Sequence, residues 1–175
     1  MAAKFPVHVY DGLLQVVSVS GELIRNGVQL PSLILLYSCI DALGWLAVPG
    51  RARPSTFTDW VDRYMLPERP LQCSSAELYG ARCGVLHTFT PDSDLANSGK
   101  ARRLVYAWGG ASVPDLQKAV DAQSPGQFVA VSIDDVWDGL RLGTARFFDI
   151  AQHDEAIADC INQKGLSYFW FVRPS

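Results

Sequence analysis

Apolar residues recur at helical spacing through most of the first half of the chain. From Val7 to Val28 they return every three or four positions, which predicts an amphipathic helix. A second helix is expected from Pro31 to about Val48, because proline suits the first turn of a helix. Apolar residues surround nearly the whole circumference of this segment, as in a central helix. A short helix from Ser55 or Thr56 to Leu66 should follow, with Trp60 and Tyr64 four residues apart.

The segment from Ser74 to His87 carries the clearest boundary signals. Ser74-Ser75-Ala76-Glu77 has the pattern of a capping box, which predicts the start of a helix. Pro91, followed by two aspartates, indicates that the helix has ended soon after His87. We expect this helix to pack against the apolar helix Pro31–Val48 at the centre of the fold.

The second half of the chain mixes strand and helix patterns. Short runs rich in β-branched and aromatic residues predict strands at Arg103–Trp108 and Phe128–Ile133, and a third candidate strand lies at Tyr168–Val172. Helices are expected at Val113–Ala122, from Asp134-Asp135 to about Phe148, and from about Asp154 to Gln163.

These patterns predict a mainly α fold, a helical bundle with a small β-sheet appended in its second half. A chain of 175 residues is long enough for one domain with a sizeable core. We therefore expect a single domain over residues 1–175, with a helical core at 1–91 and a strand-containing extension at 100–175.

Composition restricts the classes of function. The apolar content of 49% with 19% charged residues is that of a globular protein. A net charge of −3 gives no global attraction for nucleic acid, so RNA binding requires a local basic patch. The cluster Lys100, Arg102 and Arg103 is the candidate RNA-binding patch, and solvated loop residues are the alternative interpretation.

Several other classes of site are absent from the sequence. There is no phosphate-binding loop, dinucleotide fingerprint or zinc-protease motif, and we expect no cofactor. The four cysteines lack metal-ligand spacing, which predicts no metal site, and Cys39 and Cys160 fit small core positions. Leu30–Val48 approaches the apolarity of a membrane span but contains Asp41, so a buried core helix is expected. A reduced, cytoplasmic protein without membrane association follows.

Arg82 and His87 form the candidate catalytic site. Five positions along a regular helix turn about 140°, so the two side chains converge only if the last turn is irregular. Gly84, between them, weakens the helix. A histidine at a helix C-terminus faces the negative end of the macrodipole, which favours imidazolium. A fixed cation beside an imidazole can stabilise phosphate charge and transfer a proton, as RNA cleavage requires.

This site resembles the HEPN superfamily, small helical-bundle proteins many of which are metal-independent ribonucleases of toxin–antitoxin and phage-defence systems. The resemblance rests on Arg82 and His87, with four residues between them, at the end of a late helix, and on the apolar helix before it. It covers roughly Val7 to Pro91. It implies a homodimer whose two Arg–His pairs form one cleft, an RNA substrate, an antitoxin-type protein partner, and cleavage that leaves a 2′,3′-cyclic phosphate.

Two positions depart from the family pattern. Cys83 stands where many active members have a polar residue after the arginine. Phe89 stands where some members have a tyrosine that a partner enzyme modifies. The motif also occurs a second time, at Arg146 and His153, in a segment that has the pattern of an ordinary amphipathic helix.

Asp41 is a supporting candidate, because a carboxylate within an apolar helix needs a partner such as Arg82 or His87. The alternative is that Arg82 and Asp41 form a structural ion pair and His87 caps the helix. The chain would then be a catalytically inactive helical module for dimerisation or for binding RNA or protein. Exposure of Arg82 and His87 distinguishes the two.

Overall fold

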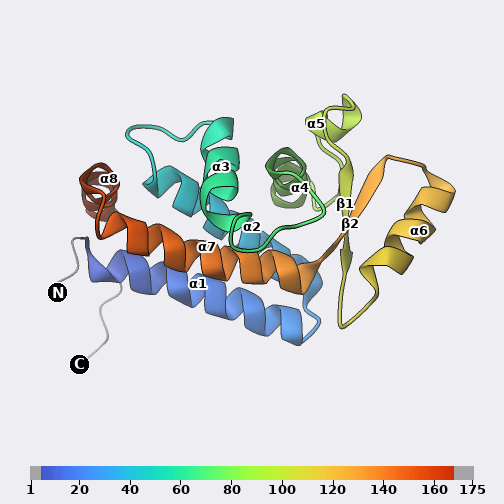
Figure 1. The fold of residues 1–175 in the computed structure, drawn as a ribbon, viewed down its shortest axis with the longest axis horizontal. Coiled ribbons are helices and arrows are strands. Elements are labelled where there is room, and N and C mark those ends of the chain that lie inside the picture. Colours follow the sequence, from blue (N-terminus) through green and yellow to red (C-terminus); the bar gives the residue numbers. More distant parts are fainter. Residues whose placement is uncertain (1–4, 168–175) are drawn as a thin grey trace.

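The computed structural model describes residues 5–167 of the chain, and within them the fold is mainly α-helical (Figure 1). A small two-stranded sheet lies in the second half, as the sequence predicts. In chain order the elements are α1 (Val7–Arg25), α2 (Gln29–Leu46), α3 (Pro54–Trp60), the π-helical turn η1 (Val61–Met65), α4 (Ser75–His87), α5 (Asp94–Asn97), β1 (Arg103–Ala107), α6 (Val113–Gln123), β2 (Phe128–Ser132), α7 (Ile133–Ala151) and α8 (Glu155–Gly165).

The apolar helix α2 is the centre of the bundle. It contacts α1, α3, α4, α7 and α8, and its side chains Leu36, Tyr37, Ile40 and Leu43 are fully buried. The predicted packing of α2 against α4 is therefore confirmed. In the part of the chain that the structure describes, α2 alone has the length and apolarity to cross a membrane, and half of its residues are buried inside the fold.

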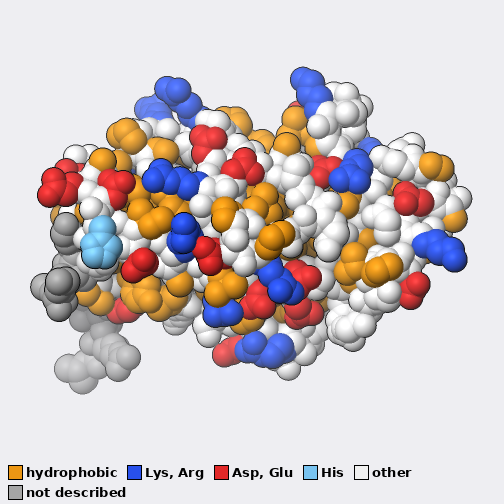
Figure 2. All heavy atoms as spheres, in the orientation of Figure 1, with side chains coloured by type: hydrophobic (Ala, Val, Ile, Leu, Met, Phe, Trp, Pro, Cys, Tyr) orange, Lys and Arg blue, Asp and Glu red, His pale blue; other side chains and the backbone are white. Residues whose placement is uncertain are grey.

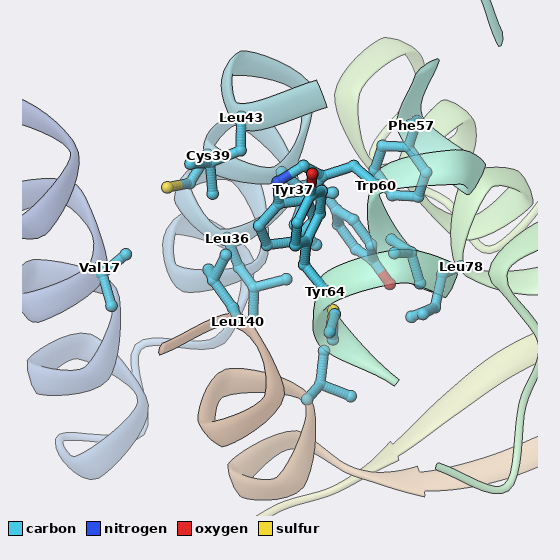
Figure 3. Packing of buried hydrophobic residues seen from close by; sticks show 14 of the residues in the cluster. Val17, Leu36, Tyr37, Cys39, Leu43, Phe57, Trp60, Tyr64, Leu78 and Leu140 are labelled. Atoms are coloured by element: carbon cyan, nitrogen blue, oxygen red, sulfur yellow. The ribbon is translucent and has the colours of Figure 1, made fainter. Parts of the chain in front are cut away.

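Both halves of the chain contribute to one hydrophobic core. Long helix α7 lies alongside α1 and also contacts α2 and η1 (Figure 1). Figure 3 shows Leu140 of α7 near Leu36 of α2, in the same buried cluster as Val17 of α1 and Trp60. The strand-containing half is thus more than a peripheral addition, because α7 supplies part of the bundle.

The predicted helix through Leu66 changes geometry after Trp60. The chain continues as the π-helical turn η1, against which α7 packs. A Cβ on Gly143 of α7 would lie 2.9 Å from the carbonyl oxygen of Tyr64, so the close approach requires glycine. Trp60 and Tyr64 contact each other with ring centroids 5.8 Å apart, and both pack against Phe147.

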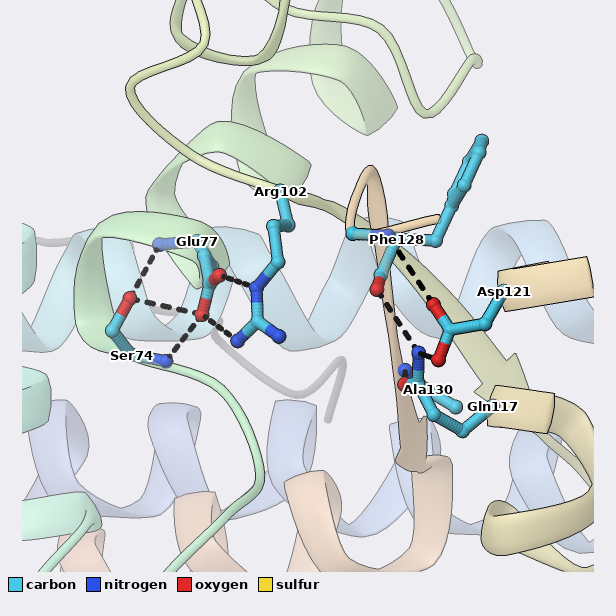
Figure 4. Close-up of polar contacts among 8 residues, drawn as sticks. Ser74, Glu77, Arg102, Gln117, Asp121, Phe128 and Ala130 are labelled. Carbon is cyan, nitrogen blue, oxygen red and sulfur yellow. Dashed lines mark hydrogen bonds and ion pairs between the residues drawn. The ribbon is translucent and has the colours of Figure 1, made fainter. Parts of the chain in front are cut away.

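Strands β1 and β2 pair in parallel, with Arg103 opposite Phe128 and Ala107 opposite Ser132. Parallel strands need a crossover, which α6 supplies. The side-chain amide of Gln117 donates to Phe128 O and accepts from Ala130 N, so it satisfies part of the free edge of β2 (Figure 4). The third candidate strand, Tyr168–Val172, lies outside the described residues.

The last helix is tied to the bundle by polar contacts at α2. Lys164 of α8 donates to the carbonyl oxygens of Trp45 and Val48, at the C-terminal end of α2. Cys39 is buried as expected, whereas Cys160 is only half-buried, because α8 packs against the bundle on one side through α2 and α7. All four cysteines are free thiols.

Candidate active site at the end of helix α4

Helix α4 begins at the predicted capping box. Ser74 Oγ accepts from the backbone N–H of Glu77, and a carboxylate oxygen of Glu77 accepts from the backbone N–H of Ser74 at 2.8 Å. These reciprocal bonds satisfy two donors that the helix itself leaves free. They set the register of α4 and so determine which residues lie at its other end.

Arg82 of α4 is held by Asp41 of α2. Arg82 Nε donates to Asp41 Oδ2 at 2.6 Å, and Arg82 Nη2 lies 2.6 Å from the same oxygen. The side chains are 21% and 31% exposed, so solvent reaches the pair. Desolvation lowers the pKa of Arg82, but the hydrogen bond and charge of Asp41 outweigh it and raise the pKa above its ordinary value. The guanidinium is therefore permanently charged and fixed in position.

The third nitrogen of the guanidinium reaches the histidine. Arg82 Nη1 lies 3.3 Å from His87 Nε2, and His87 is exposed to solvent. A guanidinium only donates, so a hydrogen bond between these two atoms requires His87 Nε2 to be the acceptor. Helix α4 remains α-helical through His87, contrary to the expected irregular last turn. The length of the arginine side chain bridges the five-residue spacing instead.

Gly84 positions the turn that follows His87. A Cβ on Gly84 would lie 2.3 Å from the carbonyl oxygen of Thr90 and 2.7 Å from that of Asp92, so the turn rests directly on the helix. Thr88 and Thr90 also donate backbone N–H groups to the carbonyl oxygen of Gly84. The sequence suggested that Gly84 weakens the helix; in the structure it permits close approach. Phe89 in this turn has a positive φ of 57° and is 63% exposed.

Two further side chains on α4 contact Arg82. Cys83 Sγ accepts a long hydrogen bond from Arg82 Nη1 at 3.9 Å. The ring of Tyr79 lies with its centroid 5.9 Å from Arg82 Cζ, and it also packs against Phe57 of α3. Burial raises the pKa of Tyr79, and the hydrogen-bonded Cys83 thiol adds to this shift. Tyr79, which lies three residues before Arg82 and four before Cys83, is a site residue that the sequence pattern did not indicate.

The predicted RNA-binding residues Lys100, Arg102 and Arg103 lie outside α4, in the loop after α5 and at the start of β1. Arg102 Nε donates to Glu77 Oε1 at 2.5 Å (Figure 4). Arg103 Nε donates to Asp92 Oδ1 at 2.7 Å. The structure brings Arg82, His87, Asp41 and Cys83 together at the C-terminal end of α4, whereas Arg102 pairs with Glu77 at its start.

Surface charge elsewhere is mixed. On the face shown in Figure 2, cationic and anionic side chains alternate without a large region of one sign. The second Arg–His motif lies in such a region of mixed charge. Its Arg146 Nη1 pairs with Glu68 Oε1 at 3.2 Å, and its His153 is exposed beyond the end of α7. Within residues 5–167, no three His, Cys, Asp or Glu side chains are grouped closely enough to suggest a metal site.

Comparisons of the chain with known protein families, with curated proteins and with solved structures find no match.

Proposed function

We propose that the chain is a metal-independent endoribonuclease of the HEPN type, with Arg82 and His87 as its catalytic residues. The observation that carries the proposal is the 3.3 Å approach of Arg82 Nη1 to His87 Nε2 at an exposed helix end. Asp41 fixes the guanidinium from a second helix, so the arrangement is built before substrate binds. Preorganised charge is effective because it needs no rearrangement in the transition state.

In the proposed reaction the nucleophile belongs to the substrate. When substrate binds, His87 Nε2 exchanges its contact with Arg82 Nη1 for the ribose 2′-OH and accepts the proton of that hydroxyl, and the 2′-oxygen attacks the adjacent phosphorus. The bond from phosphorus to the 5′-oxygen breaks, the 5′-oxygen takes a proton from water, and His87 afterwards releases its proton to solvent. Arg82 Nη1, which Asp41 leaves free, donates to a phosphate oxygen as charge develops. The products are a 2′,3′-cyclic phosphate and a 5′-OH.

A homodimer is part of the proposal. Leu30, Ile34, Ser38, Asp41 and Trp45 lie within about 80° of one another around α2. Leu30 is 37% exposed, and Ile34 and Trp45 are only partly buried. This apolar face carries Asp41 and so adjoins the site. A second copy seated there would cover the face and bring two Arg–His pairs together, as the HEPN resemblance implies.

The second candidate function is an inactive helical binding module. It is favoured by the ion pair itself, since Arg82 commits both Nε and Nη2 to Asp41. A structural ion pair between two core helices would use the same contacts. Cys83, in place of the polar residue of active family members, fits this alternative as well.

The test is cleavage of fluorescently labelled RNA in excess EDTA, with the termini of the products identified by mass spectrometry. We expect 2′,3′-cyclic phosphates, and we expect His87→Ala to lower the rate by about 100- to 10,000-fold. His153→Ala is the matched control, because His153 is also exposed. Light scattering should report a dimer. Full cleavage by His87→Ala would assign the activity elsewhere, and no cleavage by the folded parent would favour the binding module.

A further inference from the structure

Two adjoining hollows lie beside the start of the β-sheet. The first has a volume of about 530 Å³, and its walls include Lys100, Arg102, Arg103 and Glu77. The second has a volume of about 790 Å³, and its walls include Pro114, Pro125 and Phe128. Both volumes fall in the range of small-molecule sites. Arg102 and Gly126 line both hollows, so one ligand can occupy parts of each.

The first hollow is rich in positive charge, although the protein carries a net charge of −3. Three cations line it; Arg102 pairs with Glu77 and Arg103 pairs with Asp92, which leaves the charge of Lys100 without a paired carboxylate among the described residues. Arg102 uses Nε and Nη2 to bind Glu77, which leaves Nη1 for another acceptor. Lys100 is exposed, and its side-chain ammonium makes no hydrogen bond or ion pair to any described residue. An anionic group can therefore bind Lys100 and Arg102 without displacing Glu77.

The second hollow has flat, apolar walls. Pro114 begins α6, Pro125 precedes β2, and Phe128 opens β2. The polar side chains at its floor are already engaged: Gln117 bonds to the β2 backbone, and Asp121 accepts from Gln117 Nε2 at 3.0 Å (Figure 4). Proline and phenylalanine faces suit a flat ring, whereas an ionic group would find few free partners there.

We propose that these hollows form a binding site for a nucleoside monophosphate group. Its phosphate lies between Lys100 Nζ and Arg102 Nη1, and its base lies against Phe128 and the two prolines. Arg102 stands between the capping box and the Gln117 cluster in Figure 4, where it can contact the phosphate at the junction of the hollows. The proposal depends on these two hollows alone and is independent of RNA cleavage at Arg82 and His87.

The experiment is an NMR titration of the ¹⁵N-labelled protein with adenosine 5′-monophosphate. We expect the amide signals of residues 99–103 and 126–128 to shift, and adenosine or inorganic phosphate alone to bind more weakly. Lys100→Ala and Arg102→Gln should each weaken binding by about ten- to hundredfold, the worth of a charge-assisted hydrogen bond. Lys118→Ala, an exposed lysine on α6 that does not line either hollow, is the matched control.

Two outcomes would overturn the proposal. One is the absence of shifts at these residues with about 10 mM nucleotide, which excludes even weak affinity. The other is parent-like binding by Lys100→Ala, a variant that leaves all described ion pairs intact. Binding of a short RNA with and without a 5′-phosphate shows whether the nucleoside monophosphate group belongs to an RNA end or to a free nucleotide. Tighter binding of the phosphorylated RNA assigns the site to RNA ends, and equal binding assigns it to free nucleotide.

Arg82→Ala separates this inference from the proposed ribonuclease. Nucleotide binding at residues 99–103 should survive that substitution, because Arg82 contacts Asp41 and His87 and does not line either hollow. Loss of RNA cleavage with retained nucleotide binding would support both proposals. Loss of nucleotide binding in folded Arg82→Ala would place the ligand at the Arg82–His87 site and overturn the inference.

Discussion

Each end of α4 contains an ion pair between an arginine and a carboxylate, but the two ends differ in which polar side chains remain available to a ligand. At its start, Glu77 binds the backbone of Ser74 and the guanidinium of Arg102, and the side chain of Glu77 is 9% exposed. At its end, Arg82 binds Asp41, but His87 is exposed and faces solvent beside a charged guanidinium. A satisfied carboxylate stabilises a helix, whereas an exposed imidazole beside a fixed cation can act on a substrate. The comparison predicts that substitutions at the start change stability alone, whereas substitutions at the end change activity and, where they disturb the turn on Gly84 or the Asp41–Arg82 pair, stability as well.

The largest effect on folding should come from Gly84, because the turn after His87 packs directly on this residue near the C-terminal end of α4. Gly84→Ala should lower the free energy of unfolding by about 2 kcal/mol, because its Cβ would collide with backbone oxygens that cannot move independently. Gly80→Ala is the control: its Cβ would meet the Ser93 hydroxyl at 3.3 Å, and alanine favours the helix. Urea unfolding of both variants tests this. Equal stabilities would contradict the close packing of the turn on Gly84.

Removal of the carboxylate that holds Arg82 should have the next largest effect. Asp41→Ala should destabilise the fold by about 1–2 kcal/mol, less than for a fully buried pair, because solvent reaches both side chains. The combined variant Asp41→Ala with Arg82→Ala should cost less than the sum of the two single changes. Additive losses in thermal or urea unfolding would show that the two residues do not stabilise each other.

At the start of α4, Ser74→Ala should cost about 1 kcal/mol through loss of the cap. Ser98→Ala offers a control, since the Ser98 hydroxyl bonds only within the exposed turn after α5. The comparison of the two helix ends requires that Ser74→Ala leave the rate of RNA cleavage per folded molecule unchanged. A cleavage defect in folded Ser74→Ala would show that the start of α4 also serves activity.

The smallest effect should be a pH dependence set by Glu77. Burial raises its pKa, but the hydrogen bonds from Arg102 and Ser74 outweigh burial, and the net pKa is lowered. This contribution to stability is present above the unfolded-state pKa of about 4.3 and is lost as pH falls through the lower folded-state pKa. Glu77→Gln should therefore have a lower free energy of unfolding than the parent at about pH 6, and the difference should shrink as the pH falls. Urea midpoints between about pH 3 and 6 measure this, and a constant difference would contradict it.

Local signals in the sequence predicted both ends of α4. The capping box, Pro31 in the first turn of α2 and the β-branched runs of β1 and β2 each act within a few residues, so pattern alone indicates them. The pairing of Arg82 with His87 and with Asp41 was also anticipated from the type and placement of these residues.

Features that depend on distant parts of the chain were not predicted. The π-helical turn η1 packs against glycines of α7, about eighty residues later in the chain. The edge contact of Gln117 and the backbone approach at Gly84 likewise need three-dimensional positions that periodicity does not specify. Tyr79 was missed for a different reason: an aromatic residue in an apolar helix resembles an ordinary core residue until its neighbour is known to be Arg82.

The most direct test of the central claim is a kinetic cycle on Arg82 and His87. The rate of cyclic-phosphate formation is measured for the parent, Arg82→Ala, His87→Ala and the double variant, all checked for folding. If the two residues act as one catalytic unit, each single change should lose most of the activity, and the double variant should be no slower than the slower single variant. Cleavage at the parent rate by folded His87→Ala would contradict the account.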